Sequence, residues 1–377
     1  MEKILIYFLF LVLIPGFSFA IGTVKIAVIM PVTGIADLTS RPLINTARFA
    51  VNEINQTGGV LRTHIKLVEF DNQSTPLGSK FAAEKAVKAG VIAVIGAIRS
   101  SNSIAMAKIL QNAKIPMISP TSTNPALTLE GNYIFRVCFV DTFQGKVMAN
   151  FAFDDLNAKE TVVLTNTENR YCTGLAASFI KEFKNLSGNI LWEGDYLEKI
   201  SNFDSLVRKA GAFNPKVIFV PGYVKDSALI IRKARENGIS SIFLGGDAWN
   251  DIMYDYEGGI ITGSFYSTSW HPGSISPESL KFVGKYKKKF GKIKNYNLGL
   301  VYDAVMILKQ AIQRGKSLDP RDIRDSLALI KDFKGVTGKI GFNKNGDPVN
   351  KSAVILKFQN NTSIYIKTVY SGCDKEL

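Results

Sequence analysis

The sequence predicts an α/β protein with two similar lobes, each built on a parallel β-sheet. Short apolar runs rich in β-branched residues alternate with helical patterns in two successive blocks of the chain. Strands that alternate with helices form a parallel sheet that is covered on both faces. The chain has 377 residues, and this length fits about two domains of roughly 150 residues each.

The first block contains four strands and the helices between them. Near-continuous apolar runs bounded by Gly or Pro are typical of strands buried on both faces, and they occur at 24–30, 65–71, 91–95 and 115–119. Apolar residues at three- and four-residue steps predict a helix from Ile44 to Ile54, which Gly58 and Gly59 end. A second helix is predicted over 82–89.

The second block repeats this order. It predicts strands at 161–165, 190–192, 216–221 and 242–244, and helices at 171–183, 201–212 and 226–237. After about residue 270 three helices follow in sequence, at 277–290, 298–314 and 319–330, and then strands at 338–342, 352–358 and 364–370. Helices after two α/β blocks indicate a return to the first lobe. We therefore expect several short crossovers between the lobes and not one tether.

The N-terminus, residues 1–20, is predicted to be a secretory signal peptide. Lys3 precedes an apolar run over 4–14, and Ser18 and Ala20 are small residues before a cut at Ile21. The alternative is a membrane anchor, but the run is shorter than the roughly 20 residues of a spanning helix. We expect a protein exported to the periplasm. No Cys follows the cut, so nothing indicates a lipid anchor.

Composition and motifs argue against an enzyme. Nucleotide, nucleophile and zinc motifs (GxGxxG after a strand, GxxxxGK[ST], GxSxG, HExxH) are absent. The two histidines, His64 and His271, leave little room for zinc or histidine catalysis. We expect no metal and no cofactor. Cys138, Cys172 and Cys373 allow one disulfide or none, and we expect no bridge.

The formal net charge is +14, which favours anionic partners without identifying one. Lysines gather between positions 285 and 294 and could contact phosphates. A solvated helix face is the interpretation we prefer, because no nucleic-acid motif accompanies them. We expect no nucleic-acid partner, and the lysines in question are Lys285, Lys287, Lys288, Lys289, Lys292 and Lys294.

Polar clusters follow the third and fourth strands of the first block. Gly96 turns the chain after one strand, with Ser100 or Ser101 expected to cap the next helix, and Thr121 and Thr123 are expected to be exposed after the other. Ligands of open α/β sheets bind at the carboxyl ends of strands, where helix N-termini favour a carboxylate. Ordinary capping and turn chemistry is the alternative.

The second block offers complementary groups. Tyr171 opens a helix, Tyr223 follows a strand, and Asp247 follows Gly245 and Gly246. Asp247 is either a turn residue or a partner for an ammonium group. Donors in one lobe and a carboxylate in the other fit a small zwitterion, because each buried charge then has a partner.

At these residues the chain resembles the periplasmic leucine/isoleucine/valine-binding proteins of bacterial ABC importers. The resemblance covers nearly the whole chain after the leader, and it is carried by VKIAVIMPVTG, AVNEINQTGGV, VIAVIGAIRSS, PMISPTSTNPALT, NRYCTGLA, VIFVPGY, FLGGDAWND, GLVYDAV and GVTGKIGFNKNGDP. It implies the type I periplasmic-binding fold, with two Rossmann-like lobes and several hinge crossovers. The implied division is 22–141 plus 270–344 for lobe 1, and 142–269 plus 345–377 for lobe 2.

The resemblance also implies site residues in a cleft between the lobes. Ser100, Thr121 (through its backbone N–H) and Thr123 match positions that hold the ligand's α-carboxylate. Asp247 matches the acid that meets the α-ammonium, with Tyr223 beside it, and Tyr171 matches an aromatic that closes over the ligand. We add four further candidates, Ile98, Arg99, Ser101 and Trp249.

Three departures bear on the ligand. Residues 35–39 (IADLT) stand where family members often carry an aromatic, a family cysteine pair is absent, and Cys172 stands where a small residue is common. Gln73, Ser74 and Arg99 occupy the neighbourhood of the missing cysteines. Arg99 forms a surface salt bridge, which is the interpretation we prefer, or helps to bind an acidic ligand.

The resemblance predicts a monomeric, non-enzymatic protein that captures an aliphatic amino acid and delivers it to an ABC permease. The alternative is a sensor for amides, urea or aromatic acids, because the same fold hosts many ligands.

Overall fold

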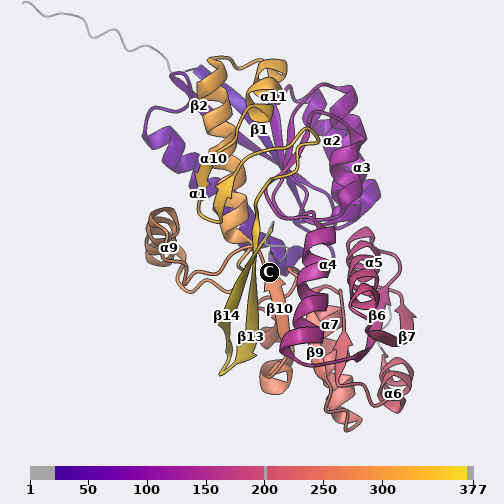
Figure 1. Cartoon of the computed structure of the whole chain (residues 1–377). Helices are drawn as coiled ribbons and strands as arrows, with labels where there is room; N and C mark the ends of the chain where they lie inside the picture. The colour runs from indigo at the N-terminus through magenta and orange to yellow at the C-terminus, as the bar shows by residue number, and fades with distance from the viewer. Residues whose placement is uncertain (1–21, 199–201, 372–377) are drawn as a thin grey trace, which may run out of the picture.

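The computed structural model of the protein describes residues 22–198 and 202–371. The predicted signal peptide, 1–20, and Cys373 lie outside these residues. Two large sheets organise the chain, one in the upper part and one in the lower part of Figure 1. The predicted α/β class with parallel sheets is confirmed.

The first sheet is parallel throughout and has the order β2-β1-β3-β4-β5. Its strands are β1 (Gly22–Met30), β2 (Thr63–Asp71), β3 (Ala93–Gly96), β4 (Met117–Ser119) and β5 (Ile134–Arg136). Side chains of β1 alternate between two cores, because successive residues of a strand point to opposite faces. Ile26 and Val28 face one core, whereas Ala27 and Ile29 face the other.

Helices cover both faces of this sheet. The helices α2 (Pro76–Lys88) and α3 (Ser100–Asn112) pack together on one face. The helix α1 (Asp37–Gln56) packs with α10 (Leu298–Gly315) on the other. A 3₁₀ segment, η1 (Pro125–Glu130), lies against α3.

The second sheet has the order β14-β13-β10-β9-β8-β6-β7. Its strands are β6 (Glu160–Asn166), β7 (Asn189–Tyr196), β8 (Val217–Phe219), β9 (Ile242–Gly245), β10 (Phe265–Thr268), β13 (Ser352–Gln359) and β14 (Thr362–Tyr370). The first five are parallel, and β13 and β14 join antiparallel at the edge.

Two pairs of helices flank the second sheet. The helix α4 (Asp141–Asn150), continued by the π-helical η2 (Phe151–Asp155), packs with α5 (Arg170–Asn185). The helices α6 (Asp204–Ala212) and α7 (Val224–Glu236) form the other pair, with α8 (Met253–Glu257) and the 3₁₀ segment η3 (Gly258–Ile261) beside α7.

The chain returns to the first sheet after β10, as expected. The helices α9 (Pro277–Phe290), α10 and α11 (Pro320–Ala328) follow, and then a hairpin of β11 (Phe333–Gly335) and β12 (Gly338–Ile340). The chain therefore passes between the sheets after β5, after β10 and after β12. The exact division at 141, 269 and 344 stays a prediction.

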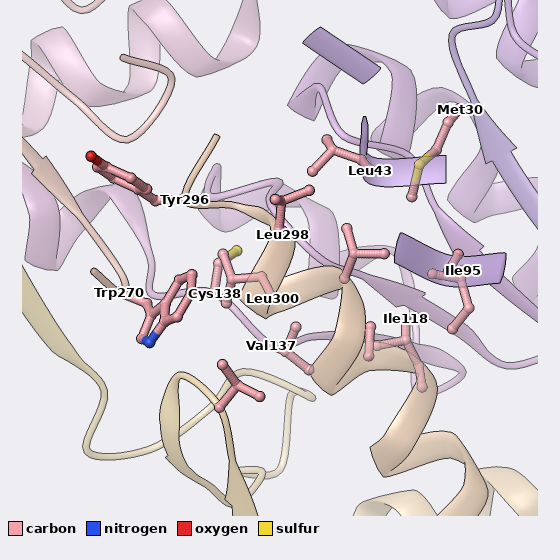
Figure 2. Packing of buried hydrophobic residues seen from close by; sticks show 14 of the residues in the cluster. Met30, Leu43, Ile95, Ile118, Val137, Cys138, Trp270, Tyr296, Leu298 and Leu300 are labelled. Carbon is pink, nitrogen blue, oxygen red and sulfur yellow. The ribbon is translucent and has the colours of Figure 1, made fainter. Parts of the chain in front are cut away.

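The crossovers meet in one packed region. Figure 2 shows Val137 and Cys138 of the first crossover close to Trp270 of the second and to Leu298 and Leu300 of α10. Cys138 and Cys172 are free and buried.

A buried series of hydrogen bonds connects the third crossover to α10. Lys351 Nζ donates to the carbonyl of Thr337 at 2.8 Å and to its Oγ1 at 2.6 Å. The Thr337 hydroxyl in turn donates to Asp303 Oδ2 at 2.6 Å. All three residues are buried, so the charges of Lys351 and Asp303 are linked through one hydroxyl.

Sequence patterns missed some of the short elements. The strands β5, β10 and β11, of three or four residues each, were not predicted, although β4, β8, β9 and β12 are as short and overlap predicted strands. The prediction of a serine cap was wrong, because Arg99 is the N-cap of α3 and no side chain caps that helix.

Candidate functional site

A cleft lies between the two lobes. From the side of the first sheet and its helices it is lined by Ile35, Ala36, Thr39, Leu43, Ile98, Arg99, Ser100, Thr121, Asn295 and Asn297. From the side of the second it is lined by Tyr171, Glu198, Tyr223, Val224, Lys225, Asp226, Asp247, Ala248, Asn250 and Tyr256. Most of these residues follow the carboxyl ends of strands, where an open parallel sheet binds its ligands.

Ser100 and Thr121 form the donor side of the cleft. Gly96 positions them, because it ends β3 with a φ of 137° and a Cβ there would lie 2.2 Å from the Ile29 carbonyl oxygen. Ser100 begins α3, so its hydroxyl lies at a helix N-terminus that favours anions. The Thr121 hydroxyl donates to the Ile98 carbonyl at 2.8 Å. Its backbone N–H makes no hydrogen bond to another described residue, and is free for a carboxylate.

Thr123 lies behind the cleft and does not line it. Its carbonyl accepts from the Asp141 N–H at 2.9 Å, and its hydroxyl has no partner among the described residues. The expectation that Thr121 and Thr123 are exposed was wrong, because both are buried. The turn after β4 is covered by η1 and by the second lobe, which the local sequence does not reveal.

Asp247 forms the acidic side of the cleft, directly after β9. It is 4% exposed, and Gln144 Nε2 donates to its Oδ1 at 3.1 Å. Burial raises the pKa of Asp247 to about 7, although the hydrogen bonds from Gln144 and Tyr171 act in the opposite direction. Asp247 forms no ion pair within the described part of the chain. A buried carboxyl that lines a cleft without a cation is suited to an ammonium ligand.

Tyr171 and Tyr223 pack beside Asp247, with ring centroids 5.3 Å apart. The Tyr171 hydroxyl accepts from the Ala248 N–H at 3.3 Å. Gly246 makes room for it, because a Cβ at Gly246 would lie 2.4 Å from that hydroxyl. Both rings therefore belong to the wall of the cleft next to the carboxyl group.

Arg99 reaches across the cleft from the first lobe. Its guanidinium pairs with Glu198 and donates to Asn169 Oδ1 at 3.3 Å. It also lies over the Tyr223 ring, 3.9 Å from the centroid. Burial alone would lower the pKa of Arg99, but Tyr223 and Glu198 raise it above its usual value. The expected salt bridge exists, but its Arg99 side is buried and it joins the lobes, so its assignment to the surface was wrong.

The other three candidates lie in different places. Ile98 lines the cleft. Ser101 does not, and its hydroxyl accepts from the Arg170 N–H at 2.9 Å, a contact between the lobes. Trp249 is fully buried against Gly245 and the ring of Phe358, in the core under β9. Trp249 thus supports the strand and does not reach the cleft.

Sequence reasoning missed several lining residues. Leu43, Val224 and Tyr256 add apolar surface, and Asn295 and Asn297 add polar surface. Only their positions along the chain could have indicated these residues, because Val224 follows β8 and Asn295 precedes α10. Asp226 also lines the cleft, and burial together with nearby Glu198 raises its pKa to about 6.

The described residues contain no group of His, Cys, Asp and Glu side chains arranged to hold a metal ion. In the same ranges no helix is both long and apolar enough to span a membrane. The lining of the cleft combines apolar walls and hydrogen-bond donors with the charged residues Arg99, Glu198, Lys225, Asp226 and Asp247.

Comparisons with known proteins give a consistent result. Residues 23–362 match the family model of the periplasmic binding proteins. The leucine-, isoleucine-, valine-, threonine- and alanine-binding protein of Pseudomonas aeruginosa is 24% identical, over 89% of this chain and 90% of that protein.

Two solved structures are also similar. The leucine-binding protein LivK of Thermotoga maritima is 35% identical, with a TM-score of 0.88 over 92% of this chain and 98% of that one. LivJ of Streptococcus pneumoniae, a branched-chain amino acid transporter substrate-binding protein solved with isoleucine, is 27% identical. Its TM-score is 0.87 over 92% of this chain and 99% of that one. On this evidence the chain belongs to the periplasmic binding proteins, a family of solute-binding proteins, and within it to the leucine/isoleucine/valine-binding group.

Proposed function

We propose that the protein captures a small aliphatic amino acid between its lobes and delivers it to the membrane subunits of an ABC importer. The observation that carries this proposal is Asp247, a buried carboxyl group that faces the cleft without a cation. Ser100 and the Thr121 N–H stand in the same cleft and suit the other end of a zwitterion.

The apolar lining supports an aliphatic side chain on the ligand. Ile35, Leu43, Val224 and Tyr256 contribute apolar surface to the lining of the cleft. Apolar walls with a few polar groups that fix orientation are typical of small-molecule sites. The ligands of similar proteins, leucine and isoleucine among them, are of the same kind.

The assignment of single residues follows from these positions. Ser100 and Thr121 hold the α-carboxylate, Asp247 holds the α-ammonium, and Tyr171 and Tyr223 close the wall beside it. Thr123 acts from behind the cleft. Binding is the whole function, and no step of catalysis is assigned to these residues.

We also propose that the protein is exported, cleaved after Ala20 and active in the periplasm as a monomer. It needs no nucleic-acid partner for this function. The family's solute-binding role supports the location, and the leader sequence supports the route.

A thermal-shift screen of the purified protein tests the proposal. A ligand that binds only the folded state raises the melting temperature, by an amount equivalent to about 2.7 kcal/mol at a hundredfold excess over Kd. We expect leucine, isoleucine or valine to give the largest shifts and their carboxamides to give none. Shifts with benzoate or urea and none with any amino acid would contradict it.

A further inference from the structure

A strongly basic surface lies on α9, away from the cleft. The residues Ser279, Phe282, Val283 and Tyr286 are buried at three- and four-residue steps. Positions 280, 281, 284, 287 and 288 therefore fall on the opposite, outer face of the helix. Lys281, Lys287 and Lys288 are exposed there, and Lys292 is exposed just after the helix end. In Figure 1 α9 stands at the side of the molecule.

Carboxylates do not neutralise these four lysines. Lys285 pairs with Glu53 and Lys294 pairs with Asp255, so two neighbours of the cluster have partners. Lys281, Lys287, Lys288 and Lys292 form no ion pair with any described residue. Glu278 in the first turn is the one acid on α9. The outer face of the helix thus carries positive charge that the fold leaves without a counterion.

The neighbouring hairpin adds to this charge. The strand β11 packs beside α9, and Lys334 of β11 is directly opposite Lys339 of β12. Both side chains are exposed, and like charges directly opposite on two strands destabilise a hairpin. An anionic partner that covers such a surface relieves the repulsion, and this makes the free energy of binding more favourable.

Apolar side chains lie among the lysines. Leu280 is 57% exposed on the outer face of α9, and Ile275, just before the helix, is 86% exposed. Lysines next to exposed aliphatic side chains are typical of helices that rest on a lipid surface, with the apolar groups between the headgroups. Phosphate contacts to nucleic acid favour arginine and stacking aromatics instead. Positions 275–292 contain no arginine, and the ring of Phe290 packs against Phe49 and Tyr286.

We propose that the outer face of α9, with the β11–β12 hairpin, binds the anionic phospholipid headgroups of a membrane surface. The area is defined by Leu280, Lys281, Lys287, Lys288, Lys292, Lys334 and Lys339. Binding there holds the protein at a membrane and leaves the cleft lining untouched. The proposal does not depend on which ligand the cleft takes.

Co-sedimentation with vesicles tests this surface. We expect the purified protein to bind phosphatidylglycerol vesicles at low salt and not phosphatidylcholine vesicles, with affinity that falls as salt rises. The variant Lys281→Gln/Lys287→Gln/Lys288→Gln should bind the anionic vesicles about a hundredfold more weakly, at about fivefold for each lysine. Leu280→Gln should weaken binding further. All variants share the same termini, so residues outside the described ranges contribute equally.

The matched control removes the same charge elsewhere. Lys108, Lys181 and Lys216 are exposed and form no ion pair with a described residue, and the triple change of these to Gln should lower binding only slightly. Equal losses in both triple variants would mean that net charge alone drives binding, and would overturn the proposal. Equal binding to neutral vesicles, no binding at low salt, or tighter α9-dependent binding to duplex DNA would also overturn it.

Discussion

Arg99 and Glu198 form a partly buried ion pair that joins the two lobes across the cleft. Arg99 follows β3 of the first sheet and is 4% exposed, and Glu198 follows β7 of the second sheet with 22% of its side chain exposed. The pair exists only when the lobes are close together. It therefore contributes to the free energy of closure, in addition to any ligand.

Glu198→Gln should weaken ligand binding, because closure would then bury the Arg99 guanidinium without a carboxylate. Loss of one partner of a buried pair costs about 3–5 kcal/mol. Since Glu198 is partly solvated, we expect about 1–2 kcal/mol, measured as affinity by calorimetry.

Small-angle scattering should also give a larger radius for the unliganded Glu198→Gln variant. Glu236→Gln is the control, since it breaks exposed pairs with Arg232 and Lys233 within one lobe. An unchanged affinity in Glu198→Gln would show that the pair has no role in closure.

Asp247→Asn should abolish amino-acid binding and yet stabilise the unliganded protein at neutral pH. Burial raises the pKa of Asp247 to about 7, whereas an unfolded Asp has a pKa of about 3.9. Between these values the folded state binds more protons than the unfolded state, so this group lowers stability as pH rises from 4 to 7. The variant should lose that part of the pH dependence in thermal melts.

Ligand binding to the unaltered protein should release a proton at about pH 6 to 7, because the ammonium group favours the charged carboxylate. Calorimetry in buffers of different ionisation enthalpy measures the number of protons. Asp226→Asn is the control, since Asp226 also lines the cleft with a raised pKa. If that variant loses the proton release, then Asp226 and not Asp247 is its source.

Ser100→Ala and Thr123→Ala should weaken ligand binding to different extents, although the sequence predicts similar roles for the two residues. Ser100 lines the cleft and Thr123 does not. We expect Ser100→Ala to weaken binding by about 1–3 kcal/mol, the usual range for a hydrogen bond to a charged group. Thr123→Ala should have a smaller effect. Equal losses would indicate that Thr123 reaches the ligand after a rearrangement of the turn.

The sequence predicted residues of the cleft lining that strands position. Residues directly after strands, such as Ser100, Thr121 and Asp247, could be placed because parallel strands end at a common edge. The position of Trp249 could not be predicted in this way. Two residues after Asp247 the chain turns into the core, and this turn depends on the tertiary packing of Trp249 against Phe358. Glu198 had no local signal, since its role arises only from contact with Arg99 in the other lobe. Contacts between lobes are set by the hinge crossovers, which a local pattern does not encode.

Thr337→Val should destabilise the protein, because the Thr337 hydroxyl links the buried charges of Lys351 and Asp303. The change removes one of the two hydrogen bonds that the buried Lys351 ammonium donates and one of the three that Asp303 accepts. Each unsatisfied buried group costs about 1–3 kcal/mol, so we expect a total loss of about 2–4 kcal/mol in denaturant unfolding. Thr167→Val, at an exposed position, is the control and should change stability little.

The pH dependence supplies a second readout for the same group. Burial lowers the pKa of Lys351 to about 8, and Asp303 opposes this shift. An unfolded Lys has a pKa of about 10.4, so between pH 8 and 10 the unfolded state binds more protons and stability rises with pH. Without the Thr337 hydroxyl the charged form of Lys351 is held less well, and this rise should begin at a lower pH in Thr337→Val. If the two proteins have parallel stability curves from pH 7 to 10, the hydroxyl does not couple the two charges.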